Sequence, residues 1–510
     1  MKKAYILAHD LGTSGNKAAL FDTNGNLCSS SLFEYKTFYE KHNWVEQDPA
    51  DWWKAICIST KKLINKADIS KKDILCICFS AQMMGCLPVD DKGNPLRKNI
   101  IWADMRSVEQ AKFIEDKLSM EKVYKITGHR ISPAYSAAKI LWVKDNQPDI
   151  YSKTYKFLHA KDYIIHKLTS EFVTDYSDAS GMNLLDLNKL DWSDDILDAI
   201  GLSRSILPDL HASTDIAGRV SKESAEEVGL MEGTPVVIGG GDGCCAATGA
   251  GVVEEGSAYN VIGSSSWIAL SSKKPIFDPL MRTFNWVHLD KTLFSPCGTM
   301  QSAGYSYSWL KNTLCGLEVL EGKEQKVSPY QIIDREVESS SNPGAGNLLF
   351  LPYLLGERSP RWNSKATGAF IGLKMNTGKG DIYRSVLEGV TFNLKVILDI
   401  FDTVLPIDKV IIIGGGAKSR LWLQILADIW QKPVIVPRYL EEATSMGAAV
   451  CGGVGIGLFD DFKIAAKINW IVDEIRPRSE YKEKYDKLYT MFNNAYKSLE
   501  SIYEGLADIE

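Results

Sequence analysis

The chain has 510 residues, of which 45% are hydrophobic and 24% charged, and its formal net charge is -6. This composition is typical of a folded globular protein of two or three domains and excludes a disordered chain. Basic and acidic residues are intermixed without a Lys/Arg block, so we expect neither nucleic acid nor a membrane surface as a partner.

The N-terminus and the cysteines bear on the cellular compartment. The apolar start of the chain is stopped by His9 and Asp10, too early for a signal peptide, and no stretch reaches the roughly 18 apolar residues of a membrane span. The ten cysteines include no C-x-x-C pair, so no zinc site is expected. Reduced thiols without a leader or a span predict a cytoplasmic protein.

A polar loop joins two apolar segments near the N-terminus. Residues 5–8 and 18–22 predict strands. The segment between them contains an acid, two hydroxyls and a lysine, which are Asp10, Thr13, Ser14 and Lys17. Exposed N–H groups in such a loop can bind phosphate oxygens, and the acid can hold Mg2+ directly or through water. The spacing is not that of a Walker A loop, and an ordinary hairpin with a polar tip explains the pattern equally well.

Helices and strands then alternate through the first half. Residues 52–67 have the pattern of an amphipathic helix begun by Asp48-Pro49, and residues 73–80 that of a buried strand. Residues 107–127 and 135–170 are helical in pattern.

A further strand is predicted at residues 100–106, where Trp102 and Asp104 stand near its end. Sugar sites combine an aromatic face with carboxylates, because sugars have apolar C–H faces and hydroxyl rims. A core Trp beside a helix-capping Asp is an equally good interpretation.

The central stretch is a β-branched strand at residues 236–238 followed by three glycines and Asp242. The small residues at 244–251 predict a tightly packed helix after it. An acid directly after a strand and a glycine turn lies where open α/β sheets bind ligands. A turn-capping Asp is the commoner explanation of such a pattern taken alone.

The second half repeats this organisation. A strand at residues 258–262, a hydroxyl-rich turn at 263–266 and a strand at 267–270 repeat the order of residues 5–21. The strand at residues 410–413 then leads into a triple-glycine turn and a helix at 421–431, a natural place for a nucleotide. We interpret this turn as the counterpart of the central glycine stretch, and the chain as two related halves.

Together, and in this order, these motifs resemble the FGGY family of carbohydrate kinases over nearly the whole chain. Asp10–Ser14 is similar to the first phosphate motif of that family, Gly263–Ser265 to the second, and Gly414–Gly416 to its adenosine motif. The most specific part is Gly368–Leu373 followed by Asp381–Glu388, which fits a family signature throughout.

The resemblance implies an α/β fold of two actin-like (ribonuclease H-like) ATPase domains with a cleft between them. The first domain, residues 1–247, would bind the sugar and contribute the first phosphate loop. The second domain, residues 248–510, would bind ATP. The resemblance is also compatible with a homodimer.

The resemblance also implies a role for each candidate site residue. Asp242 would be the catalytic base, and Asp10 would hold Mg2+. The residues that would bind ATP and its phosphates are Thr13, Ser14, Lys17, Gly263, Ser264, Gly414, Gly415, Gly416 and Ser419. The residues that would line the sugar site with Asp242 are Met83, Met84, Trp102 and Asp104.

Within the family the chain most resembles the xylulokinases, which implies ATP-dependent phosphorylation of D-xylulose to D-xylulose 5-phosphate. Three positions depart from that pattern, because Met84, Ala103 and Gly243 stand where xylulokinases usually have His, Asn and Asn. Missing polar partners change selectivity strongly. Gluconate, L-xylulose, ribulose and polyols therefore remain alternatives. A non-enzymatic actin-like or Hsp70-like ATP switch is disfavoured by Asp242 and the signature.

Overall fold

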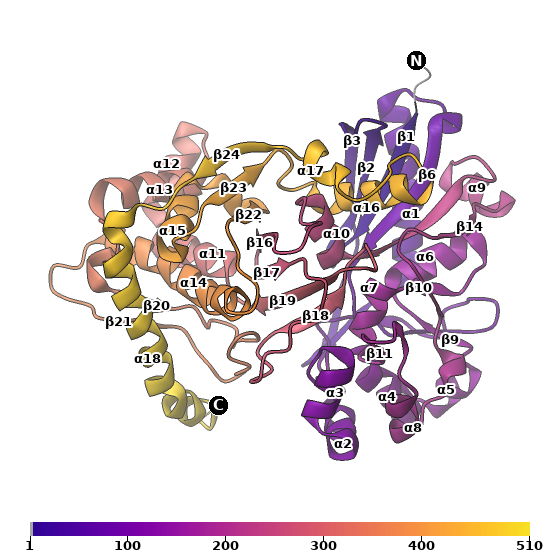
Figure 1. Cartoon of the computed structure of the whole chain (residues 1–510), viewed down its shortest axis with the longest axis horizontal. Helices are drawn as coiled ribbons and strands as arrows, with labels where there is room; N and C mark the ends of the chain where they lie inside the picture. The colour runs from indigo at the N-terminus through magenta and orange to yellow at the C-terminus, as the bar shows by residue number, and fades with distance from the viewer. Residues whose placement is uncertain (1–3, 510) are drawn as a thin grey trace.

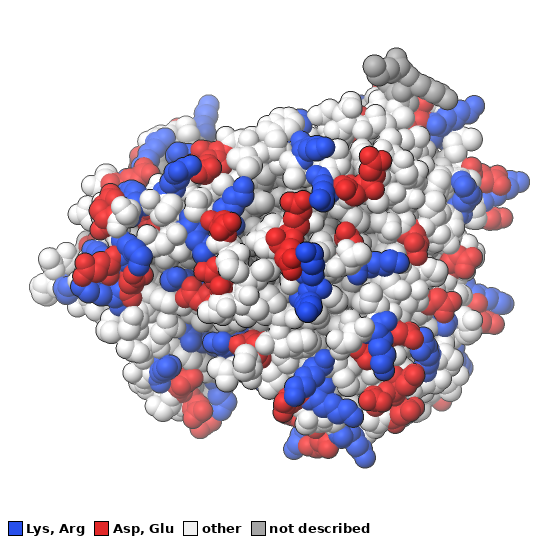
Figure 2. Space-filling view, viewed as in Figure 1, with Lys and Arg blue, Asp and Glu red and all other residues white. Residues whose placement is uncertain are grey.

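The computed structural model describes residues 4–509. Two β-sheets, one from each half of the chain, lie side by side and are surrounded by helices (Figure 1). Within the described residues, no helix combines the length and the apolar character needed to cross a membrane. On the face drawn in Figure 2, acidic and basic side chains are interspersed, as the composition predicted.

The first sheet has six strands in the order β14-β15-β6-β1-β2-β3. Their bounds are β1 (Tyr5–Leu11), β2 (Gly15–Asp22), β3 (Leu27–Glu34), β6 (Ile74–Ala81), β14 (Ile216–Arg219) and β15 (Pro235–Gly241). β1 and β2 form the predicted hairpin, and β1, β6 and β15 run parallel. The parallel strands are buried almost throughout, which is why their sequences read as continuous apolar runs.

The second sheet has seven strands in the order β18-β19-β17-β16-β22-β23-β24. Their bounds are β16 (Ala258–Ile262), β17 (Ser266–Leu270), β18 (Phe284–Val287), β19 (Phe294–Met300), β22 (Val410–Ile413), β23 (Val434–Pro437) and β24 (Ile471–Ile475). β16 and β17 are an antiparallel hairpin, and β16, β22 and β23 run parallel.

The two sheets share one topology, which confirms the structural repeat. Each has a hairpin, an antiparallel strand beside its second arm, two parallel strands beside its first arm and an antiparallel strand beyond them. One detail of the prediction was wrong. β22, which leads into Gly414–Gly416, corresponds to β6, whereas the central strand β15 corresponds to β23.

The predicted glycine turn after residue 238 is wrong, because β15 continues through Gly241, whereas Gly414–Gly416 does follow the end of β22. The two glycine stretches look alike for a local reason. Gly239 and Gly414 both have positive φ, at 74° and 87°. A Cβ would lie 1.8 Å from the Phe79 carbonyl oxygen at the first position and 2.7 Å from the Ile262 carbonyl oxygen at the second. Both positions need glycine because the backbone there passes against a neighbouring strand. Similar sequences here reflect similar crowding and not equivalent places in the sheets.

Helix α10 (Asp242–Gly249) crosses α16 (Ala443–Gly455) at very close range. A Cβ at Gly249 would lie 1.7 Å from the Ala443 carbonyl oxygen, and one at Gly447 1.9 Å from the Cys245 carbonyl oxygen. The small-residue run after Asp242 therefore packs as predicted. α16 comes from the second half of the chain but lies on the first sheet, against β1, β6 and β15 (Figure 1).

The remaining helices of the first half follow the sequence pattern with more interruptions than predicted. They are α1 (Pro49–Ala67), α2 (Val108–Leu118), α3 (Met120–Thr127), α4 (Ser136–Asn146), α5 (Pro148–Lys153), α6 (Ala160–Thr169), α7 (Tyr176–Ala179), α8 (Asp194–Ile200) and α9 (Lys222–Val228). Asp48 caps α1 as expected. The helical pattern at 135–170 is split because Pro148 begins a new helix and β9 (Lys156–Leu158) follows it.

The predicted strand at 100–106 is reduced to β8 (Asn99–Ile100), and the chain turns at Trp102. Short additional strands of the first half are β4 (Phe38–Lys41), β5 (Trp44–Gln47), β7 (Leu87–Val89), β10 (Val173–Asp175), β11 (Leu185–Asp186), β12 (Asp191–Trp192) and β13 (Asp209–His211). β5 pairs with β8, so the segment before Trp102 is fixed by the sheet that contains Gln47.

The second half contains the longest helices. Its helices are α11 (Gly304–Leu314), α12 (Gly316–Gln325), α13 (Pro329–Ser340), α14 (Lys379–Asp402), α15 (Arg420–Trp430), α17 (Ile464–Ile468) and α18 (Lys482–Ala507), and β20 (Leu349–Leu351) pairs with β21 (Ala369–Ile371). The family signature lies mostly in α14, whose side chains fill the core. Glu388, the last residue of the signature, is buried and accepts hydrogen bonds from the Gly344 N–H and the Tyr485 hydroxyl.

Candidate active site

Asp242 is the first residue of α10, directly after the end of β15. The backbone before it is crowded, since a Cβ at Gly241 would lie 2.4 Å from Met83 Sδ. Asp242 Oδ1 accepts a hydrogen bond from the Gly243 N–H at 2.7 Å. The Gly243 carbonyl accepts one from the Tyr259 hydroxyl of the second sheet at 2.6 Å. The carboxylate therefore lies where the two halves of the protein meet.

The surroundings of Asp242 hold its proton more tightly than water would. Burial, followed by the charge of Asp10, raises the pKa of Asp242 to about 7, against the pull of the Gly243 N–H. Burial disfavours the charged form, and a second carboxylate nearby disfavours it further. A carboxyl group with this pKa can take up and release a proton near neutral pH.

Asp10 lies near the end of β1, two strands from β15 in the same sheet. Its Oδ1 accepts a hydrogen bond from the Ser80 hydroxyl at 2.8 Å. Burial raises the pKa of Asp10, while this hydrogen bond and the charge of Lys17 lower it. Two carboxylates at the carboxyl ends of parallel strands are placed where open sheets bind ligands.

The first predicted phosphate loop is a tight turn fixed from several sides. Gly12 N–H donates to the Gly15 carbonyl at 2.9 Å and closes the turn. The Thr13 carbonyl accepts from Gln47 Nε2 at 2.6 Å, and its hydroxyl accepts from the Trp102 indole at 2.9 Å. Ser14 is exposed at the tip. The loop is thus held rigid from behind while its tip stays open.

Lys17 lies on β2 and bonds to the second half of the chain. Its Nζ donates to the Glu441 carbonyl at 2.9 Å and to Glu442 Oε1 at 3.2 Å. The residue thus bridges β2 to the segment that begins α16, and in this conformation its ammonium does not point freely into the loop. A phosphate contact by Lys17 stays a prediction.

A cavity of about 530 Å³ opens beside the second predicted phosphate loop. Its walls include Gly263 and Ser264 from the β16–β17 turn, and Gly415, Gly416 and Ser419 from the turn after β22. Gly414 lies just behind this wall, where its N–H donates to the Leu440 carbonyl at 3.0 Å. Two segments about 150 residues apart in sequence are therefore brought to one cavity.

The sequence did not single out Asp334 and Tyr307, two of the polar residues that line this cavity. Ser419 Oγ donates to Asp334 Oδ2 at 2.7 Å, and the Tyr307 hydroxyl donates to Asp334 Oδ1 at 2.5 Å. Ser419 Oγ also accepts from the Trp422 N–H and so caps α15. Asp334 lies on α13, where an acidic residue in an amphipathic helix gives no sequence signal of a site.

The sequence patterns of known families match both halves of this arrangement. The pattern of the FGGY family of carbohydrate kinases, N-terminal domain, matches residues 5–249, and that of the C-terminal domain matches residues 258–456. The chain belongs to the FGGY family of carbohydrate kinases.

Relatives cover this kinase from end to end. It is 33% identical to the xylulose kinase of Bacillus subtilis (strain 168) over 98% of each chain. It is 31% identical to the gluconokinase of Bacillus licheniformis over 99% of this chain and 98% of that one. The crystal structure of ligand-bound xylulose kinase from Lactobacillus acidophilus has a TM-score of 0.91 at 25% identity, covering 99% of this chain and 100% of that one.

These similarities make the protein a sugar-kinase phosphotransferase, and the family implies that ATP is its phosphoryl donor. An ATP switch without chemistry is thereby excluded. The names of the relatives include two different substrates, so the comparisons do not decide the sugar.

Three of the residues predicted to line the sugar site form an apolar wall. Met83 and Met84 are buried in one cluster with Tyr135 and Trp286, and Trp102 packs against it. Met84 has a φ of 60°, in the left-handed region that only a tight turn imposes on such a residue. Four side chains besides Asp242 were predicted to line the sugar site. Three of them, Met83, Met84 and Trp102, lie in or against one cluster.

The sequence missed Lys139, whose ammonium fixes this wall. The side chain is fully buried in α4, and its Nζ donates to the carbonyls of Met84 at 2.8 Å, Ile101 at 2.7 Å and Ala134 at 2.6 Å. One ammonium therefore ties the Met84 turn to the segment that leads into Trp102. The helical pattern at 135–170 gives no sign of this role, because the three carbonyls belong to other segments of the chain.

Asp104 is placed differently from the prediction. Its carboxylate is fully buried and forms an ion pair with Arg106, whose Nη2 lies 2.6 Å from Asp104 Oδ2. Asp104 Oδ2 also accepts from the Val45 N–H. The Arg106 guanidinium donates to both carboxylate oxygens of Asp104. Asp104 therefore stabilises the turn after Trp102. We therefore assign it no sugar contact.

Proposed function

We propose that this kinase transfers the γ-phosphoryl group of ATP to a hydroxyl of D-xylulose and forms D-xylulose 5-phosphate. The observation that carries the proposal is Asp242, a half-buried carboxyl with a pKa of about 7 at the junction of the two sheets. The end-to-end similarity to a xylulose kinase supports the choice of sugar. We further propose that residues 1–247 bind the sugar and residues 248–510 bind ATP.

In the proposed mechanism, Asp242 accepts the proton of the attacking sugar hydroxyl as the phosphoryl group transfers in line. Phosphoryl transfer depends mainly on positioning and charge neutralisation, so a single ionised carboxylate suffices as the base. The N–H and hydroxyl groups of Thr13, Ser14, Gly263 and Ser264 would orient the phosphates. The cavity lined by Gly415, Gly416 and Ser419 would hold the nucleoside.

The residues present fit a magnesium ion at Asp10. Only Oδ1 of this carboxylate accepts a hydrogen bond among the described residues, and Oδ2 is left for a ligand. Carboxylate oxygens are the donors that Mg2+ prefers, usually one or two together with water and phosphate oxygens. When bound, the ion would neutralise phosphate charge, and the charge of Asp10 would hold it beside the loop.

Gluconate is the second candidate substrate. The 31% identity with a gluconokinase favours it, as do the apolar Met84 and Ala103 in place of the His and Asn expected for a xylulokinase. Gly243 leaves open space where an Asn side chain would fit, since nothing lies within 4 Å of its missing Cβ. A larger substrate has room on this side of Asp242.

A panel assay tests the proposal. The purified kinase is mixed with ATP and Mg2+, and ADP release is measured with D-xylulose, L-xylulose, ribulose, gluconate and polyols in turn. We expect the highest kcat/KM with D-xylulose. A higher value with gluconate would replace the proposed sugar, and ADP release indifferent to every sugar would refute a sugar kinase altogether.

The pH dependence of kcat/KM provides a second test. Because the base must be ionised, kcat/KM for the sugar should rise with pH up to about 7 and then level off. Asp10 and Asp178 raise the pKa of Asp242, whereas Tyr259 and Cys297 stay neutral because burial raises the pKa of each. Rates are measured from about pH 5 to about pH 9. A flat profile through pH 7 would contradict the assignment.

A further inference from the structure

A cluster of buried ionisable side chains lies near the end of β15, the strand that precedes Asp242. Its members, each no more than 1% exposed, are His159, Lys161, Asp162, Asp175 and Asp178. Lys161 Nζ lies 2.8 Å from Asp162 Oδ1, 3.2 Å from Asp175 Oδ1 and 3.6 Å from Asp178 Oδ2. Asp175 Oδ1 and Asp178 Oδ2 accept no hydrogen bond from the described residues, so this ammonium is their compensation.

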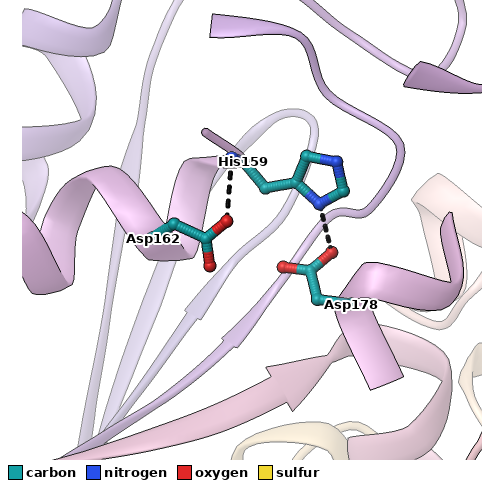
Figure 3. Close-up of side chains that lie close together, drawn as sticks. All are labelled: His159, Asp162 and Asp178. Carbon is teal, nitrogen blue, oxygen red and sulfur yellow. Dashed lines mark hydrogen bonds and ion pairs between the residues drawn. The ribbon is translucent and has the colours of Figure 1, made fainter. Parts of the chain in front are cut away.

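One side of the cluster reaches the sugar wall through His159. Figure 3 shows its ring facing Asp178, while its backbone N–H bonds to Asp162. Nδ1 lies 2.6 Å from Asp178 Oδ1, and Nε2 lies 2.9 Å from Ser136 Oγ. The Ser136 hydroxyl donates its one proton to the Gly85 carbonyl, so Nε2 must donate to Ser136. The chain of bonds ends beside the Met84 turn.

The cluster does not call for a metal ion. Ligand atoms of His159, Asp162 and Asp178 lie within 4.8 Å of one another, which is compatible with a cation between them. Lys161 already places its ammonium against two of these three groups. The Lys161 ammonium therefore supplies positive charge to these carboxylates.

The other side of the cluster reaches the backbone of the base. Ser177 Oγ donates to Asp175 Oδ2 at 2.5 Å and accepts the Gly241 N–H at 3.0 Å. Gly241 directly precedes Asp242. Ser213 Oγ also donates to Asp175 Oδ2, at 2.7 Å, but its hydroxyl makes no bond to the end of β15. The two serines share one acceptor. Ser177 bonds to the end of β15 through its hydroxyl, whereas Ser213 meets β15 through its backbone carbonyl, which accepts the Gly239 N–H at 2.9 Å and is kept in an alanine variant.

We propose that Lys161, Asp175 and Ser177 form a positioning unit that fixes the direction in which Asp242 points. The unit rests on the proposed role of Asp242 as the base. Lys161 holds one oxygen of Asp175, the other oxygen orients the Ser177 hydroxyl, and that hydroxyl holds the last N–H of β15. Gly241 has no side chain to restrain the strand end, so this bond adds to the pairing of Gly241 with Ala81 of β6. A base held in place by oriented neighbours loses activity when they are removed.

Ser177→Ala tests the unit, with Ser213→Ala as the matched control. Both variants remove one buried hydroxyl donor from the same oxygen of Asp175, so similar losses in melting temperature are expected. We expect kcat to fall about ten- to a hundredfold in Ser177→Ala alone, with KM for ATP unchanged. Ser177→Cys, which keeps a weak polar group, should recover part of the loss. Equal kcat values in the Ser177→Ala and Ser213→Ala variants would overturn the proposal.

Hydrogen exchange gives a readout that does not depend on the sugar. In Ser177→Ala the peptide that contains residues 236–245 should exchange faster than in the wild type, and in Ser213→Ala it should not. This result holds even if Ser177→Ala is too unstable for kinetics at higher temperature. Unchanged exchange in Ser177→Ala would refute the positioning unit, whereas failure of the wild type to phosphorylate any sugar would refute the proposed function instead.

Discussion

Replacing Asp242 by Asn is expected to lower kcat for sugar phosphorylation at least about a hundredfold, the scale of a lost general base. The side chain keeps its shape but can no longer accept the proton of the attacking hydroxyl. ADP release under saturating ATP and sugar measures the loss. Near wild-type turnover would show that another group, or water, takes the proton.

The same variant is expected to fold and to be at least as stable as the wild type at neutral pH. The pKa of Asp242 is raised from 3.8 to about 7, so the folded protein binds a proton more tightly than the unfolded chain does. Stability therefore falls as pH rises from about 4 to about 7, and Asn removes this cost. Asp194→Asn is the control, because Asp194 also begins a helix but is exposed. It should keep full activity.

Gly239→Ala is expected to destabilise the protein by at least about 3 kcal/mol, or to prevent folding. Gly239 has a φ of 74°, which an alanine adopts only with strain, and its Cβ would lie 1.8 Å from the Phe79 carbonyl oxygen. The backbone of β15 would have to move away from β6. Urea unfolding followed by circular dichroism measures the change.

Gly243→Ala is the matched control, four residues along the same segment. Nothing lies within 4 Å of a Cβ at this position, and the residue is inside α10. Alanine should leave the urea midpoint unchanged or raise it, because it favours a helix over glycine by about 1 kcal/mol. Equal effects at the two positions would contradict the close approach of β15 to β6.

Local patterns identified the secondary structure where one interaction dominates. The two hairpins at residues 5–21 and 258–270 were predictable because apolar runs flank turns rich in glycine and hydroxyl residues. The extent of the helical pattern at 135–170 was not, because apolar spacing does not reveal a new helix start at Pro148. The strand expected at 100–106 gave way to a turn. There Lys139 Nζ donates to the Ile101 carbonyl and Asp104 Oδ2 accepts from the Val45 N–H, two long-range bonds that no local pattern contains.

The strongest family signal and the site itself lie in different places. The second part of the signature, Asp381–Glu388, is in α14, where Tyr383, Leu387 and Glu388 are buried. A motif can therefore identify a family through its packing and say nothing about the substrate. Asp104 and Lys139 show the opposite case, since their roles depend on which distant groups fold against them.

Sequence patterns alone were enough to identify the family, the reaction class, the paired hairpins and the position of Asp242 after a glycine-rich strand. These features depend on neighbours along the chain, where composition and spacing act directly. Other features became visible only in the folded chain: β22 corresponds to β6, Asp104 accepts a hydrogen bond from the Val45 N–H, and Ser177 connects buried charges to the residue before the base. They depend on groups far apart in sequence, as does the burial that raises the pKa of Asp242.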